Sequence, residues 1–516
     1  GGELNSTDRQ STWFRGWGYQ YNNGGVPYLD YRLFKQSQEE NSVYYSNDFT
    51  YYRNLAFFGM ATYSYKGRYT INGTLRYEGT NKLGKSRQAR WLPTWNVSGA
   101  WNAHEERWWS PAFGKAWTYA SLKGSYSLTA DRGPAGVTNS LAVFSSFTPF
   151  RPSTSASETG IQLYDLENSE LTYEKKHELN IGVAFGFVDN RINVEFDWYR
   201  RNNFDLIGYV QTMGVGGMTT KLANDATMKS TGCEFTISTT NIKTKDFKWT
   251  TDWIFGWAQN EITKLDSRSQ VYQLVNGFGR TEGRPIGALY SIPFAGLTEE
   301  GLPTFFIDAE HTQVVGPSNY DAIYFQEYEN VDYLKYEGSI DPTITGSFGN
   351  TLSWKGLKLN VFFTYSFGNV LRLDDLCPVY SSDYSDLTAS MKEMKNRWMV
   401  PGDEQLTTIP AIPTVRQMRE INALNNAYSA YNYSTERVAK GDFIRLKELS
   451  LAYDLPKKVF EGQNAVSSFG VKVSATNLWL AYADKKLNGR DPEYYNSGGV
   501  SSPVPRQFTL TVKLGF

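Results

Sequence analysis

The sequence predicts an all-β protein, a transmembrane antiparallel β-barrel, on the strength of three observations. Apolar and polar residues alternate over segments of about ten residues, the length that a tilted strand needs to cross a bilayer. Aromatic residues make up 16% of the 516 residues and glycine occurs 45 times; aromatic residues favour strands and membrane interfaces, whereas glycine marks turns and bends. Short and long connections alternate, as they do in membrane barrels.

The alternation is clearest at the end of the chain. There Phe508, Leu510, Val512, Leu514 and Phe516 fall on one face, and threonine, lysine and glycine fall on the other. The same period of two runs through residues 69–77, 178–187, 191–198 and 357–367. Because successive side chains of a strand point to opposite faces, one face of each segment can meet lipid while the other meets water.

The connections divide into two kinds. Tight turns are predicted at Lys66–Gly67, Asp189–Asn190 and Lys355–Gly356. Long connections, on the external side, are predicted near residues 22–54, 78–93, 130–176, 201–231, 258–343, 368–442 and 481–506. The connection over 102–118 is longer than an ideal inner turn. Together these features predict about 14 strands, the first around 13–21, with the whole chain, 1–516, in one barrel.

A soluble protein of several β-sandwich domains is the alternative interpretation. The segments exceed the roughly five or six residues of typical sandwich strands. Tryptophan and tyrosine also recur where an interfacial girdle would lie, as at Trp198–Tyr199, Trp249 and Trp354. The mean hydropathy of −0.48 does not oppose a barrel, because only alternate strand residues meet lipid and the loops are polar.

Charge and motif content exclude several classes of function. With 52 basic and 53 acidic residues, the chain lacks the basic excess of a nucleic-acid-binding protein. Its three histidines, His104, His177 and His311, have no metal-ligand spacing. No nucleophile-elbow or phosphate-loop pattern is present. We therefore expect no catalytic residue, metal or cofactor, and the chain is not predicted to be an enzyme.

Several ordered motifs resemble the SusC/RagA-like TonB-dependent outer-membrane transporters of the Bacteroidota. They extend over nearly the whole chain, and their order and spacing carry the match: Arg76–Gly79 with Pro93–Thr94, Leu171–Lys175, Arg191–Tyr199 with Asp205–Ile207, Gly283–Gly287, Arg397–Trp398 with Pro401, Asp442–Lys447, Asn477–Leu478, Asp491–Glu493, and the terminal strand. One departure is Thr80–Leu83, where the family tends toward Ser-Ser-Arg-Phe.

The resemblance implies a location in the cell outer membrane and a barrel of about 22 strands, of which this chain supplies about 14. It also implies a plug domain and a TonB-contacting N-terminal region that are absent from this sequence, so we expect the chain to be the C-terminal part of a longer protein. The implied partners are TonB, a SusD-like surface lipoprotein and outer-membrane lipid. Closure of the barrel would require the earlier strands, because lipid does not tolerate an open sheet edge.

Two loop clusters are candidate substrate-binding sites. One contains Tyr320, Tyr324 and Tyr328, beside Phe325 and Tyr333; the other contains Tyr380, Asp383 and Tyr384, beside Asp386. Aromatic faces stack on sugar rings, and carboxylates accept hydrogen bonds from hydroxyl groups. The alternative, which the sequence favours, is that these tyrosines pack the loops together or against a partner protein.

These features lead to one main hypothesis and two alternatives. The main hypothesis is TonB-dependent import of a nutrient oligomer, with glycan fragments as the first choice of substrate and oligopeptides as the second. The first alternative is a passive porin or a structural barrel of an envelope assembly, against which the connections of about 75 to 85 residues argue, since such lengths are unusual for simple loops. An outer-membrane enzyme has little support from three scattered histidines.

Overall fold

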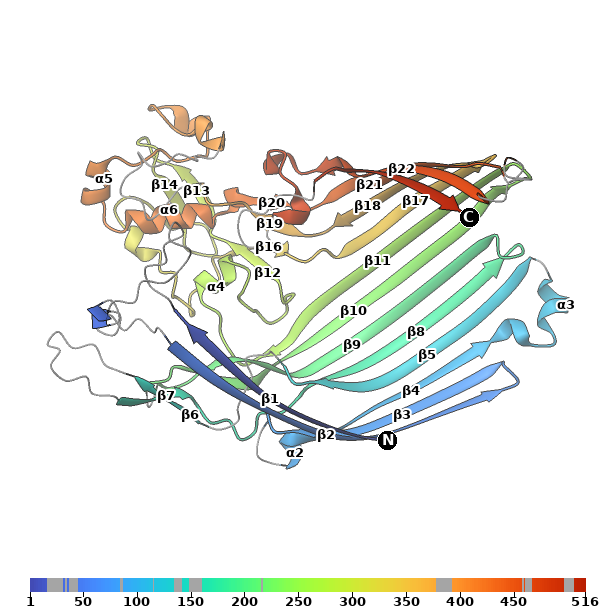
Figure 1. Ribbon diagram of the computed structural model, residues 1–516. Helices are drawn as coiled ribbons and strands as arrows, with labels where there is room; N and C mark the ends of the chain where they lie inside the picture. The colour runs from blue at the N-terminus through green and yellow to red at the C-terminus, as the bar shows by residue number, and fades with distance from the viewer. Residues whose placement is uncertain are drawn as a thin grey trace. The chain divides into compact units, whose positions relative to one another are not determined.

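The main element of the computed structural model is a 14-stranded sheet (Figure 1). The structure describes residues 1–15, 31–32, 35–36, 45–83, 87–114, 116–133, 142–147, 160–214, 217–376, 392–456, 459, 466–495 and 505–516. In sheet order the strands are β1 (Gly2–Phe14), β2 (Tyr45–Tyr65), β3 (Tyr69–Thr80), β4 (Trp91–Asn102), β5 (Trp117–Asp131), β8 (Glu174–Phe187), β9 (Ile192–Gln211), β10 (Thr220–Lys243), β11 (Phe247–Leu265), β17 (Ile344–Trp354), β18 (Leu357–Phe367), β21 (Phe443–Asp454), β22 (Ser468–Ala483) and β23 (Gln507–Gly515).

The chain divides into two compact units. One comprises residues 1–99, 125–179 and 201–228, and the other comprises residues 100–124, 180–200 and 229–516. In the part of the chain that the structure describes, no helix is both long and apolar enough to cross a membrane.

Strands of both compact units leave large apolar side chains exposed. In β3, Ile71 and Leu75 are 60% and 57% exposed, and in β23, Phe508 and Leu510 are 73% and 67% exposed. The register pairs Leu510 with Val473 of β22, so the apolar row continues across the strands. A row of this size is not stable against water and requires a lipid or protein environment. The predicted alternation is thus the lipid-facing pattern of a barrel wall.

The predicted tight turns have the backbone conformation that such turns require. In the β17–β18 hairpin, Trp354 pairs with Leu357, and the two residues between them, Lys355 and Gly356, have φ of 46° and 92°. Positive φ at both central positions makes the backbone of the turn follow the right-handed twist of the strands. Residues 66–67 and 189–190 also have positive φ.

Several strand boundaries differ from the prediction. The first described strand is β1, at residues 2–14, whereas the first strand was expected around 13–21, where residues 16–21 lie outside the described residues. β2 begins at Tyr45, inside the connection expected over 22–54. Residues 201–231 were expected to form a loop, yet β9 continues to Gln211 and β10 begins at Thr220. In these extensions side chains pack against neighbouring connections: Ile207 is 3% exposed and lies in a cluster with Leu171 and Tyr173. Because side chains on either face can find such partners, the strict alternation that marks a membrane-spanning strand disappears.

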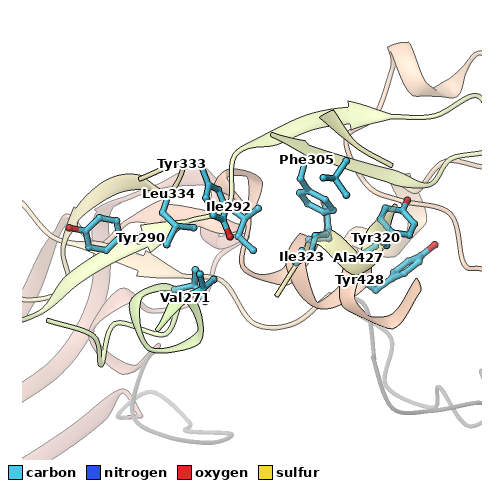
Figure 2. Close-up of a cluster of buried hydrophobic side chains, with 14 of the residues drawn as sticks. Val271, Tyr290, Ile292, Phe305, Tyr320, Ile323, Tyr333, Leu334, Ala427 and Tyr428 are labelled. Atoms are coloured by element: carbon cyan, nitrogen blue, oxygen red, sulfur yellow. The ribbon is translucent and has the colours of Figure 1, made fainter. Parts of the chain in front are cut away.

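Two long connections fold into a body with its own core (Figure 2). This loop body consists of residues 266–343 and 392–437, and its buried centre includes Val271, Ile292, Phe305 and Tyr428. Its elements are α4 (Val271–Val275), β12 (Ala288–Ser291), β13 (Phe294–Leu297), β14 (Pro303–Phe306), β15 (Val314–Val315), η3 (Tyr320–Ala322), β16 (Lys335–Ser339), η5 (Lys392–Asn396), η6 (Asp403–Gln405), α5 (Val415–Glu420), α6 (Leu424–Asn432) and η7 (Thr435–Arg437).

Shorter elements complete the described structure. Small ladders pair β6 (Val143–Phe147) with β7 (Gly160–Asp165), and β19 (Val370–Arg372) with β20 (Val438–Lys440). The remaining helical turns are α2 (Arg87–Arg90), η2 (Ala103–Glu105), α3 (Trp109–Phe113), η9 (Lys485–Leu487) and η10 (Pro492–Tyr494).

Candidate functional site

A polar groove of about 480 Å³ lies on one face of the strands nearest the C-terminus, β17, β18, β21, β22 and β23. It is lined by Thr351, Lys358, Asn360, Glu448, Ser450, Ala452, Asp454, Gly470, Val471, Lys472 and Lys513. Most of these positions alternate with the apolar row, so the period of two that creates the lipid-facing surface also creates a hydrophilic surface opposite it.

The groove carries charges of both signs. Lys472 Nζ donates to Glu448 Oε1 at 3.1 Å, and Thr351 donates to Asn360 at 3.1 Å. Among the residues that the structure describes, Lys358 and Lys513 form no ion pair. The lining therefore offers ammonium donors together with amide and hydroxyl groups to a hydrated or anionic solute.

The candidate tyrosines of the loop body have different environments. Tyr320 is fully buried, and its hydroxyl donates to the carbonyl oxygen of Pro303 at 2.7 Å. Burial raises the pKa of Tyr320 above its ordinary value. Tyr320 therefore packs inside the loop body and presents no surface to a substrate. This environment fits the packing alternative for Tyr320 and not a binding role.

Tyr324 and Tyr328 are 57% and 40% exposed. Between them, the Glu327 carboxylate accepts hydrogen bonds from the backbone N–H groups of Glu329 and Tyr328 at 2.7 and 2.8 Å. These bonds hold the pKa of Glu327 below its ordinary value. The turn that carries both rings is thus fixed by its own backbone. The remaining candidates, Tyr380, Asp383 and Tyr384, lie outside the described residues.

Two of the sequence motifs meet in space. Arg445, in β21, is buried and hydrogen-bonds to the Asp491 carboxylate, while its Nε lies 3.2 Å from Glu493 Oε2. Asp491 also caps η10 by accepting from the backbone of Glu493 at 3.1 Å. The motifs 442–447 and 491–493 therefore form one ionic contact, which fastens the segment before β23 to the strand.

Sequence reasoning missed two arginines of the loops, of which Arg437 is buried and Arg372 is partly buried. Arg437 is 3% exposed and donates to Glu393 at 2.5 Å and to the carbonyl of Asp374 at 2.7 Å. Arg372 donates to four acceptors and sits in the apolar run Val370–Leu373. A charge within such a run was the signal that could have identified Arg372. Across the described ranges, no group of three or more histidine, cysteine or acidic residues could hold a metal ion.

Comparison with known proteins gives consistent relatives, although no family model matches the chain. The chain is 26% identical over 486 residues to TonB-dependent receptor P3 of Formosa agariphila. This alignment covers 89% of this chain and 45% of that receptor. The chain is also 27% identical over 220 residues to TonB-dependent receptor SusC of Bacteroides thetaiotaomicron. This alignment covers 41% of this chain and 21% of that receptor. These relatives are named as receptors, not as enzymes.

Among solved structures, the RagAB peptide transporter matches with a TM-score of 0.73 at 22% identity, covering 100% of this chain and 52% of that chain. The chain spans about half the length of the curated receptors that it matches over most of its own length. The resemblance inferred from the motifs is confirmed: this chain is a β-barrel segment of the outer membrane, related to the SusC/RagA-like TonB-dependent transporters.

Proposed function

We propose that the complete protein imports a nutrient oligomer across the outer membrane in a TonB-dependent manner. The observation that carries the proposal is the polar groove on the face opposite the exposed apolar row. In a barrel wall, the apolar face anchors the strands in lipid and the polar face lines the path of the solute. TonB would act through a region that lies outside this chain, so the work of this segment is passive: it anchors, encloses and guides.

The loop body is our proposed docking surface for a SusD-like lipoprotein. Met399, Val400 and Leu406 are 60%, 58% and 85% exposed. The loop that carries them is held rigid, because Asp403 accepts from the backbone N–H groups of Met399 and Val400, both at 3.0 Å. Apolar side chains on a fixed backbone suit a protein contact, since little conformational entropy is lost on binding.

Serine substitution of Met399, Val400 and Leu406 together should reduce co-purification of the lipoprotein. Val314→Ser is the matched control, because Val314 is 50% exposed and lies in the same body. Equal recovery of the lipoprotein with the triple variant and with the control would place the contact elsewhere.

Two substrate classes fit different parts of the chain. The exposed rings of Tyr324 and Tyr328 suit glycan fragments, our first choice, because aromatic faces stack on sugars. The unpaired ammonium groups of Lys358 and Lys513 suit oligopeptides, the second choice, because a peptide carries carboxylates. Uptake of labelled glycans and labelled peptides by cells separates the two. Loss of glycan uptake in a Tyr324→Ala/Tyr328→Ala variant, with peptide uptake unchanged, supports the first class.

A passive porin or a structural barrel is the alternative function. Import is tested in cells that express the native-length protein, with and without a protonophore that collapses the proton-motive force. Diffusion of a small solute through general porins serves as the control and should not change. Uptake that stops with the protonophore supports the proposal, and uptake that continues identifies a passive pore.

A further inference from the structure

The connection between β4 and β5 has a structure that a strand turn does not require. It runs over 103–116 and contains η2 and α3 (Figure 1). It is longer than an ideal inner turn, and the proposed transport function gives it no role. The connection between β10 and β11, in the same compact unit, needs only residues 244–246.

Aromatic rings hold this connection together. The Trp109 side chain is only 5% exposed, and its Nε1 donates to the carbonyl oxygen of Trp117 at 2.8 Å. The Trp109 ring centroid lies 4.7 Å from those of both Phe113 and Trp117, and the Phe113 and Trp117 centroids are 5.0 Å apart. Gly114 ends α3 with φ of 51°, and its N–H donates to Ser110. The conformation is therefore fixed by packing.

The ring cluster continues the lipid-facing side of the sheet. Ala103, Trp109 and Ala120 form a buried cluster against which Phe185 packs, and Trp117 stacks on Phe187 at 5.8 Å. Phe185 and Phe187 belong to the same alternating row of β8 as Ile181, which is 42% exposed. The connection therefore lies where the lipid-facing row of β8 reaches the edge of the sheet that carries the tight turns.

Two large rings of the connection remain uncovered. Trp108 is 50% exposed and Phe113 is 38% exposed, with their centroids 6.3 Å apart. Glu105 and Arg107 are exposed beside them. An indole ring with one apolar and one polar side, next to charged groups, is typical of the boundary between lipid headgroups and acyl chains.

We propose that residues 103–114 form an interfacial membrane anchor, in which Trp108 and Phe113 enter the headgroup–acyl boundary of the adjacent phospholipid leaflet. The occupant is phospholipid and not a protein, because the exposed rings are continuous with the lipid-facing row. That this leaflet is the periplasmic one follows from the orientation assumed in the proposed function; the anchor itself does not depend on transport.

Depth-dependent fluorescence quenching tests the anchor. The native-length receptor, in a background free of other cysteines, carries Trp108→Cys labelled with an environment-sensitive fluorophore and is folded into phosphatidylethanolamine–phosphatidylglycerol vesicles. The matched control is Lys245→Cys, which is exposed in the β10–β11 turn of the same compact unit. Phe113→Cys is a second probe in case the first variant folds poorly, and heat-modifiable migration confirms folding.

Lipid spin-labelled near the headgroup should quench the probes at 108 and 113 several-fold more than the probe at 245, and aqueous iodide should show the reverse order. Equal quenching of all three positions by iodide would overturn the anchor. Strong iodide quenching that disappears only when cell-envelope proteins are added would overturn it in favour of a protein contact. If lipid quenches the probes but uptake by the receptor is unchanged by a protonophore, the proposed function is wrong and the membrane anchor is still supported.

Discussion

Replacement of Arg372 tests whether one partly buried cation holds the loop segments together. Its guanidinium donates from Nη1 to the carbonyl of Ser434 at 2.8 Å, and from Nη2 to the carbonyls of Tyr290 and Val275 at 2.6 and 3.2 Å and to the Ser291 hydroxyl at 3.1 Å. These four acceptors come from three separate stretches of chain. Arg372→Met keeps the length of the side chain and removes every one of these bonds.

Two effects of Arg372→Met oppose each other. Burial lowers the pKa of Arg372 to about 10 from its ordinary 12.5, so the charge costs about 3 kcal/mol near pH 7, which the substitution recovers. Against this, hydrogen bonds from a charged donor contribute about 1.5–3 kcal/mol each, or at least about 6 kcal/mol for four. The bonds outweigh the burial of the charge. We expect Arg372→Met to lower the free energy of local unfolding of the loop body by about 3 kcal/mol.

Pulse proteolysis across a urea series measures that free energy, since a protease cuts the loop body only when it opens. The intact protein in detergent is used, so that the sheet remains folded. Arg416→Met is the control, because the Arg416–Glu420 pair is mostly exposed and its loss should leave cleavage unchanged. Arg372→Met cleavage that matches the wild type and the control would refute the argument that hydrogen bonds dominate at this site.

Three further predictions concern the loops. Burial raises the pKa of Tyr333 to about 12. The contribution of the neutral Tyr333 to stability should be complete below pH 10 and be lost as the pH rises through 12, so the loop body should be cleaved faster at high pH. A cleavage rate that stays constant up to pH 12.5 would contradict this prediction. Arg445→Met leaves the Asp491 carboxylate, which is 11% exposed, without its partner. The loss of about 3 kcal/mol of local stability should increase proteolytic cleavage within residues 484–495. An unchanged cleavage pattern would argue against a structural ion pair. Gly301→Ala places a methyl group against the Trp398 ring at a backbone φ of 75°, which should lower the free energy of unfolding by about 2 kcal/mol. Pulse proteolysis measures this loss, and wild-type stability would mean that the Trp398 ring moves aside at no cost.

The pattern of residues along the chain predicts the barrel wall. A period of two, as in Phe508–Phe516, gives each strand one apolar face, and segments of about ten residues are longer than sandwich strands and suit a face that meets lipid, so the pattern predicts both the strands and their environment. Turn chemistry is equally local, and Lys355–Gly356 has the positive φ values that a two-residue hairpin needs. The strand ends were predicted less well, because in the outer parts of β9 and β10 side chains such as Ile207 pack against the connections and strict alternation stops.

The arrangement of the loops depends on contacts that the sequence does not reveal. Tyr320 and Tyr324 belong to one short aromatic segment, yet the first is fully buried and the second is 57% exposed. Arg445 and Asp491 are 46 residues apart, and nothing in the sequence around either residue indicates that they form an ion pair. The body formed by residues 266–343 and 392–437 buries side chains against partners distant in sequence. Such contacts follow from packing in three dimensions, whereas strand alternation and turn geometry follow from neighbours along the chain.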